Sequence, residues 1–109
     1  MAQNDDFVQY VLEQLSGLGD VSTRRMFGVV ALYHQARIFG LISGGILYFK
    51  VNDSNRADYE SRGMDRFRPY ADKPQLSMTY YQVPAEALED ADECLRWARK
   101  CVERERRGV

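Results

Sequence analysis

The segment from Val21 to Val51 restricts the fold more than any other part of the chain, because it carries four short runs of strand-forming residues. The runs are VSTRRM (21–26), VVALYH (29–34), RIFGLIS (37–43) and ILYFKV (46–51), separated by Phe-Gly, Gln-Ala and Gly-Gly. Short strands joined by two-residue loops form hairpins. Gly44-Gly45 is the strongest signal, because a primed turn requires positive φ at both central residues. The segment therefore predicts an antiparallel meander.

Alternation within the last run predicts how the sheet is covered. In ILYFKV the odd-numbered positions are all apolar, whereas the even-numbered positions include Tyr48 and Lys50. Successive side chains of a strand point to opposite faces. We therefore expect a sheet that is covered by other elements on one side.

Helical spacing and capping residues predict three helices around this sheet. We expect them from about Asp5 to Leu15, from Asp53 or Ser54 to Gly63, and from Asp90 to about Arg106, with a turn in PAEALED (84–90) and a further strand in LSMTYYQV (76–83). The predicted fold class is α+β, with an antiparallel sheet of about five to six strands flanked by helices in the order α-β-β-β-β-α-β-α. Residues 1–109 are expected to form a single domain.

Composition and cysteine spacing limit the environment of the chain. Its 109 residues carry a net charge of −1, which gives no overall attraction to nucleic acid or to an anionic membrane. No apolar run approaches the roughly 20 residues of a membrane span, and MAQNDDFVQY shows no signal peptide. Cys94 and Cys101 lie seven residues apart, about 10.5 Å along a helix, which is too far for a disulfide. We expect reduced core thiols and a cytoplasmic location.

The sequence offers little catalytic chemistry. His34 lies beside the Gln-Ala turn without a neighbouring nucleophile or orienting group, so we interpret it as a surface turn residue. One His, two separated Cys and scattered carboxylates match no compact metal-ligand set. Phosphate loops, dinucleotide motifs and nucleophile elbows do not occur either. We therefore expect no enzymatic activity, no metal and no cofactor.

Basic residues near aromatic ones are the candidates for binding. Arg24 and Arg25 lie on opposite faces of the predicted strand, with Phe27 at the following turn. DRFRPYADK (65–73) interleaves arginines with aromatic rings, a pattern that can stack bases. RWARKCVERERR (96–107) carries six basic residues against two acidic ones. These basic residues either contact phosphate or complement the negative end of the helix dipole. The candidate interaction residues are Arg24, Arg25, Phe27, Arg66, Arg68, Tyr81, Arg96, Arg99 and Lys100.

An ordered set of short motifs resembles a known family. The motifs are RRMFG, LYFKVND, NRADYESRGM, MTYYQVP and WARK. In this order they resemble the N-terminal domain of the TfoX/Sxy family of bacterial regulators linked to natural competence, from about Val8 to Lys100. The resemblance implies an α+β fold and a transcription-linked regulatory role exerted through protein partners, and it carries over no catalytic residue. Two-domain members have a second helical domain, so we expect a stand-alone copy of the first domain here.

The leading hypothesis is therefore a non-catalytic, cytoplasmic regulatory domain that binds a protein partner. The transcription machinery is one candidate for this partner. One alternative is a nucleic-acid-binding domain that uses the basic C-terminal helix. Another is a small-ligand-binding domain with a pocket near Tyr48 and Tyr80. Self-association as a homodimer is also left open.

Overall fold

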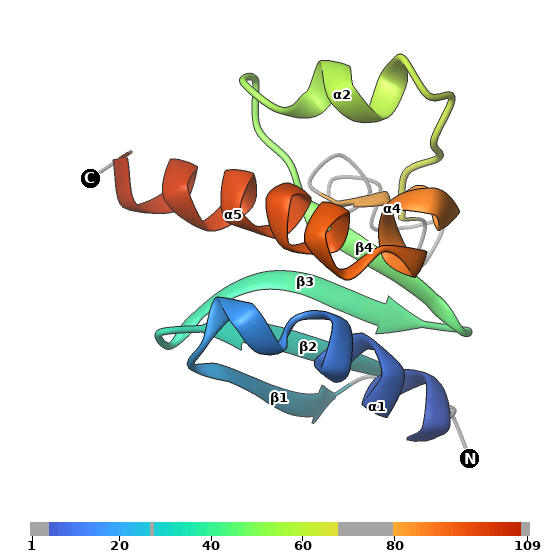
Figure 1. Ribbon diagram of the computed structural model, residues 1–109, viewed down its shortest axis with the longest axis vertical. Helices are drawn as coiled ribbons and strands as arrows, with labels where there is room; N and C mark the ends of the chain where they lie inside the picture. The colour runs from blue at the N-terminus through green and yellow to red at the C-terminus, as the bar shows by residue number, and fades with distance from the viewer. Residues whose placement is uncertain (1–4, 27, 68–79, 108–109) are drawn as a thin grey trace.

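The computed structural model describes residues 5–26, 28–67 and 80–107. Its elements, in chain order, are α1 (Asp5–Gln14), a short 3-10 turn η1 (Ser16–Leu18), β1 (Val21–Met26), β2 (Val29–His34), β3 (Arg37–Ser43), β4 (Ile46–Lys50), α2 (Arg56–Glu60), β5 (Tyr80–Gln82), α4 (Ala85–Glu89) and α5 (Ala91–Arg107). The fold is α+β, as the sequence predicts (Figure 1).

The strands form one antiparallel sheet in the order β1-β2-β3-β4-β5, which confirms the predicted meander. The two-residue hairpin loops have the backbone that primed turns require. Gly44 and Gly45 have φ of 60° and 76°, and Gln35 and Ala36 have φ of 51° and 68°. Positive φ is uncommon for residues with a Cβ, so the tight hairpin between β2 and β3 overrides the local preference of Gln35 and Ala36.

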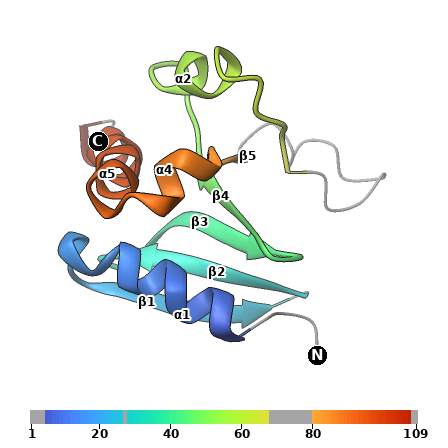
Figure 2. The same cartoon turned by 45° about the vertical axis from the view of Figure 1, so that its right-hand side comes forward.

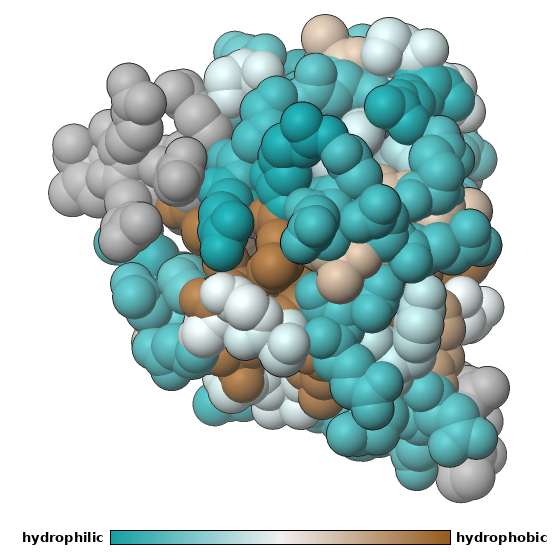
Figure 3. Space-filling model, in the orientation of Figure 1, coloured by the Kyte–Doolittle hydropathy of each residue, from teal (hydrophilic) through white to brown (hydrophobic). Residues whose placement is uncertain are grey.

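The main core lies between one face of the sheet and the helices α1, α4 and α5 (Figure 2). Val8 and Val11 of α1 and Cys94 and Ala98 of α5 pack there against apolar side chains of β2, β3 and β4. Cys94 and Cys101 are both buried and unbonded to each other, which confirms the prediction of free core thiols. In the view of Figure 3, hydrophilic residues cover most of this side, and hydrophobic residues reach the surface mainly near its middle.

The opposite face of the sheet carries a second, smaller cluster, so the expectation that only one face is covered was wrong. Ala31, Leu41, Phe67 and Tyr80 are all less than one-tenth exposed in this cluster. After α2 the chain returns alongside β5. There the backbone of Arg66 forms an isolated antiparallel β-bridge with Tyr81, and the Phe67 N–H donates to the Tyr80 carbonyl over 2.9 Å. This return places the Phe67 ring over the second face.

Several predicted details differ from the structure. The PAEALED segment forms the short helix α4 rather than a turn. His34 is only 9% exposed, and its Nδ1 lies 2.9 Å from the Gly19 carbonyl oxygen, so it is not a surface residue. Gly19 and Asp20 lead from η1 into β1, and this bend carries the carbonyl over the His34 ring. In the described part of the chain no helix is both long and apolar enough to cross a bilayer.

Candidate interaction surface between α2 and α5

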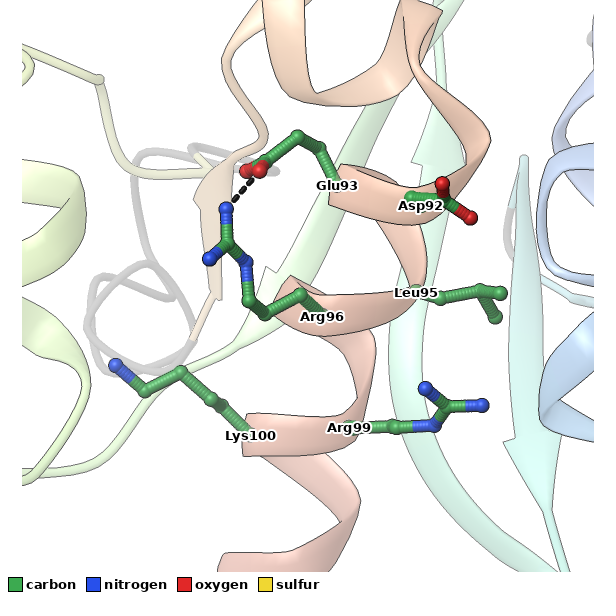
Figure 4. A pocket seen from close by; sticks show the side chains of 6 residues that line it. All are labelled: Asp92, Glu93, Leu95, Arg96, Arg99 and Lys100. Carbon is green, nitrogen blue, oxygen red and sulfur yellow. Dashed lines mark ion pairs between the residues drawn. The ribbon is translucent and has the colours of Figure 1, made fainter.

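The outward face of α5 turns a row of charged side chains toward α2. Arg96 and Lys100 are four residues apart, so they lie on the same side of the helix. Figure 4 shows that both side chains extend toward the same side, whereas Arg99 extends the other way. Glu93 forms an ion pair with Arg96 one turn earlier. An open hollow of about 630 Å³ runs along the outer side of α5 and is lined by residues that extend to both sides, Arg99 included.

Tyr59 anchors α2 to the rest of the molecule. It is 1% exposed, and its ring makes an edge-on contact with Trp97, with centroids 4.7 Å apart and planes at 83°. A second contact joins it to the Tyr81 ring at 5.9 Å. The Tyr59 hydroxyl is buried and has no hydrogen-bond partner of normal geometry among the described residues. Burial, and secondarily the nearby Cys101 thiol, raises the pKa of Tyr59 far above its usual range.

Arg62 lies over the outer side of Trp97. Its guanidinium carbon is 5.4 Å from the centroid of the Trp97 ring, within the range of a cation–π contact. The same guanidinium donates to Glu86 of α4 over 2.7 Å. A hydrogen bond from the backbone N–H of Glu86 itself, and then Arg62, lowers the pKa of the Glu86 carboxyl. Arg62 is therefore held over the indole by an aromatic face and a carboxylate together.

Beside Arg62 lies a hollow of about 270 Å³ between α2 and α5. We call this area the α2–α5 surface and define it by its lining residues, which are Asp58, Ser61, Arg62, Glu93, Arg96, Trp97 and Lys100. Lys100 forms an ion pair with Asp58 across the hollow. Three cations, two from α5 and Arg62 from the turn that follows α2, therefore line the same hollow as Trp97, and each has an ion pair with a carboxylate of the same chain.

A buried polar network lies beneath this surface and fixes the start of α2. Asn55 is 1% exposed, and its Oδ1 accepts the N–H of Asn52 over 2.7 Å. Its Nδ2 donates to the Lys50 carbonyl at 3.4 Å and approaches the Cys101 sulfur at 3.9 Å. The Cys101 thiol in turn donates to the Lys50 carbonyl at 3.2 Å. Two turns earlier on α5, burial raises the pKa of the Cys94 thiol to about 11, which keeps it protonated.

The structure separates most of the candidate residues that the sequence suggests. Arg96 and Lys100 meet at the α2–α5 surface, whereas Arg99 faces away from it. Arg24 and Arg25 lie on β1, at the other end of the sheet order from Arg66, which lies beside β5. Phe27 and Arg68 lie outside the described residues.

Tyr81 requires a correction. It is 6% exposed, and its hydroxyl donates to Glu60 over 3.0 Å. Burial and this hydrogen bond raise the pKa of Tyr81. The rings of Tyr80 and Tyr81 lie on opposite faces of the sheet, and both are buried, Tyr80 in the cluster with Phe67 and Tyr81 against the Tyr59 ring. Tyr81 supports α2 from below and does not belong to an exposed contact surface.

Sequence reasoning missed Arg62 and Trp97. Asp58 is one of the scattered carboxylates of the sequence, and it pairs with Lys100, which lies 42 residues away. One available signal was the single tryptophan, placed directly after Arg96 on a helix with a strong apolar stripe. Among the residues that the structure describes, no group of three or more His, Cys, Asp or Glu side chains is placed to hold a metal ion.

The fold and this surface define a small α+β domain, with a five-stranded antiparallel meander and a charged hollow between two of its helices. A comparison with curated proteins finds no matching relative. The sequence model of the TfoX N-terminal domain matches residues 13–104, which is most of the chain. The chain therefore belongs to the TfoX N-terminal domain family.

Proposed function

We propose that the chain is a non-catalytic regulatory domain of the cytoplasm, and that it binds an acidic segment of a protein partner at the α2–α5 surface. Family membership supports the regulatory part of the proposal, with transcription and competence as its setting. The observation that carries the binding part is that Arg62, Arg96 and Lys100 line one hollow together with Trp97, with Arg62 against its ring.

Charge favours an acidic partner. The residues that line the α2–α5 surface include three cations and two carboxylates, Asp58 and Glu93, and the carboxylate that pairs with Arg62 is Glu86 of α4, outside this lining. The Arg62–Glu86 pair is largely exposed, with side chains 43% and 68% accessible. Exposed pairs of this kind contribute about 0–1 kcal/mol. A partner carboxylate can therefore replace Glu86 at little cost.

The composition of the surface also favours protein contact. Arginine and tryptophan are enriched among the residues that dominate binding energy at interfaces. The Trp97 ring packs against Tyr59, and Arg62 covers its other side. Trp97 and Arg62 are therefore held in place before a partner arrives. Contacts that are already ordered lose less conformational entropy on binding.

The fluorescence of Trp97 tests the proposal, because it is the only tryptophan in the chain. Titration with a hexaglutamate peptide at low salt should give a saturable change in emission, because a peptide carboxylate that replaces Glu86 at Arg62 changes the charge beside the indole. Arg96→Ala should weaken this binding by about tenfold, since a hydrogen bond to a charged group is worth about 1.5 kcal/mol. Arg99→Ala is the matched control, because it removes the same charge from the other side of α5.

Two results would contradict the proposal. One is the absence of any emission change with hexaglutamate when the folded protein is confirmed by circular dichroism. The other is equal weakening by Arg96→Ala and Arg99→Ala, which would mean diffuse attraction to a polyanion rather than a site. A hexalysine peptide should leave the emission unchanged.

The two alternatives have less support from the described residues. The basic residues considered for nucleic acid are dispersed, with Arg25 bound to Asp5 at 2.6 Å and Arg96 and Lys100 bound to carboxylates. Near Tyr48 and Tyr80, the described side chains pack against one another. The Tyr48 and Phe67 rings lie 4.9 Å apart, and Tyr80 is 8% exposed.

A further inference from the structure

We infer that two copies of the chain associate through the outer edges of β1, as antiparallel neighbours centred on Thr23, and form one continuous ten-stranded sheet (twice the five of one copy). The β1 edge and the α2–α5 surface lie at opposite ends of the molecule (Figure 1). Pairing at β1 would therefore leave both copies of that surface accessible, and the inference does not depend on the proposed function.

The two edges of the sheet differ. The outer edge of β5 is occupied, because Phe67 N–H donates to the Tyr80 carbonyl and Gln82 N–H donates to the Asp65 carbonyl. β1 pairs only with β2 among the described strands. Its residues from Ser22 to Arg25 are all exposed. An edge with unpaired backbone groups is a template for another strand.

The backbone groups that face outward follow from the register. Asp20 accepts a hydrogen bond from the Gln35 N–H over 3.3 Å, and the pairing of β1 with β2 continues from there without a bulge. Hydrogen-bonded and non-bonded pairs alternate along an antiparallel ladder. Even-numbered residues of β1 therefore bond to β2, and Val21, Thr23 and Arg25 direct their N–H and C=O groups outward.

Charged side chains often block a sheet edge, but the two arginines of β1 are held over its faces. Arg25 donates to Asp5 of α1 over 2.6 Å on the face that carries the main core. Arg24 lies over the Tyr33 ring on the opposite face, with its guanidinium carbon 5.7 Å from the centroid. Neither contact requires the guanidinium to project across the outer edge, so within the described ranges the backbone of β1 is open to a strand.

The charges select the register. With Thr23 opposite its twin, the five residues from Val21 to Arg25 pair within β1, and Arg24 faces Ser22 of the second copy. Met26 then lies opposite Asp20, which is exposed. Each Arg24 has Asp20 and Arg24 of the second copy as its diagonal neighbours, one of opposite and one of like charge. Shifting the centre to Arg24 would place two like charges directly opposite each other, which is destabilising. The register centred on Thr23 is therefore favoured over the register centred on Arg24.

Engineered cysteines test both the dimer and its register. Residues opposite each other in a hydrogen-bonded pair have Cα atoms about 5.5 Å apart, within reach of a disulfide. Thr23→Cys should therefore give a disulfide-linked dimer on oxidation. Ser22→Cys is the matched control, because the two copies of residue 22 would be diagonal neighbours about 7–8 Å apart. We expect it to cross-link at least tenfold more slowly.

A second variant separates association from folding. Thr23→Pro removes an N–H that faces outward, which an edge strand tolerates. In sedimentation over a concentration series, the unmodified chain should form dimers, and Thr23→Pro should stay monomeric with an unchanged circular dichroism spectrum. The inference fails if the unmodified chain is monomeric throughout, if Thr23→Pro remains folded and dimeric, or if the two cysteine variants cross-link equally fast.

Discussion

The ring of Tyr59 stabilises the fold, whereas its hydroxyl destabilises it. Its ring contacts Trp97 and Tyr81 in the interior, whereas its hydroxyl is buried without a hydrogen-bond partner of normal geometry among the described residues. Aromatic pairs contribute about 0.5–1.5 kcal/mol beyond the area they bury. An unsatisfied buried hydroxyl costs about 1–3 kcal/mol. The two effects are separable, because they involve different atoms of the side chain.

Tyr59→Phe should therefore stabilise the protein by about 1 kcal/mol, which corresponds to a rise in Tm of roughly 5 °C for a domain of this size. The ring contacts survive in this variant, and only the unpartnered oxygen is lost. Urea unfolding followed by circular dichroism measures the free-energy change.

Tyr59→Ala is the contrasting variant, because it also removes the ring. It should cost about 3–5 kcal/mol, as large-to-small changes in a core do. A lower urea midpoint for Tyr59→Phe than for the unmodified protein would show that the hydroxyl makes a stabilising interaction, such as one with the Cys101 thiol.

At the scale of elements, the sequence predicts those that depend on local chemistry. The limits of β1, β2 and β3 coincide with the sequence runs, because two-residue breaks with glycine or small residues permit primed turns. The start of α2 was predicted at Asp53 or Ser54, but the helix begins at Arg56. Four consecutive polar residues, 52–55, are all able to cap a helix. The choice among them depends on the burial of Asn55 against Cys101, which lies 46 residues away.

The α2–α5 surface could not be predicted either, because it too depends on contacts between residues that are distant in the sequence. Asp58 and Arg62 of the α2 region meet Lys100, Trp97 and Glu86 only after the sheet has brought the two parts of the chain together. Strand pairing follows from the alternation of apolar and polar residues with a period of two and from the residues of the turns. Contacts between α2 and α5 depend instead on the tertiary position of a short helix. The family resemblance gave the fold but carried no site residues.

The attachment of α2 leads to a prediction about its dynamics. Apart from the buried Tyr59 and Asn55, the described contacts that hold it are mainly ion pairs and ring contacts at the surface. The amides of Ser61 and Arg62, which bond to the first turn and to Tyr59 of α2, should therefore exchange with solvent through a local opening. Amides shared by β2 and β3 should exchange only through global unfolding. Native-state hydrogen exchange measures both free energies.

Asn55→Ala provides the control for this opening. It leaves the Asn52 N–H without its acceptor, so exchange at Ser61 and Arg62 should accelerate by about tenfold. The amides of the strands should accelerate less than this. Equal exchange free energies for α2 and for the centre of the sheet in the unmodified protein would show that α2 unfolds only with the whole domain.

At the scale of the whole molecule, the buried titratable groups determine how stability changes with pH. The pKa values of Tyr48, Tyr59 and Tyr81 are raised chiefly by burial, and burial raises the pKa of Cys94 from 9.0 to about 11. For each group the folded state retains its proton at a pH where the unfolded chain has lost it. The stabilisation is therefore complete below pH 9 and is lost as the pH rises toward the folded pKa.

Stability should accordingly fall between pH 9 and pH 11, with Cys94 alone contributing about 2 kcal/mol to the fall. Urea midpoints at pH 7, 9 and 10.5 measure the slope. Cys94→Ala removes this one titration while keeping a small apolar side chain in the core, so its midpoint should fall less steeply with pH even if it is lower at pH 7. The remaining slope in that variant reports the tyrosines, which titrate at higher pH. Identical slopes for the two proteins would mean that the thiol reaches solvent in the folded state, and that α5 does not seal the core as tightly as its packing against the sheet implies.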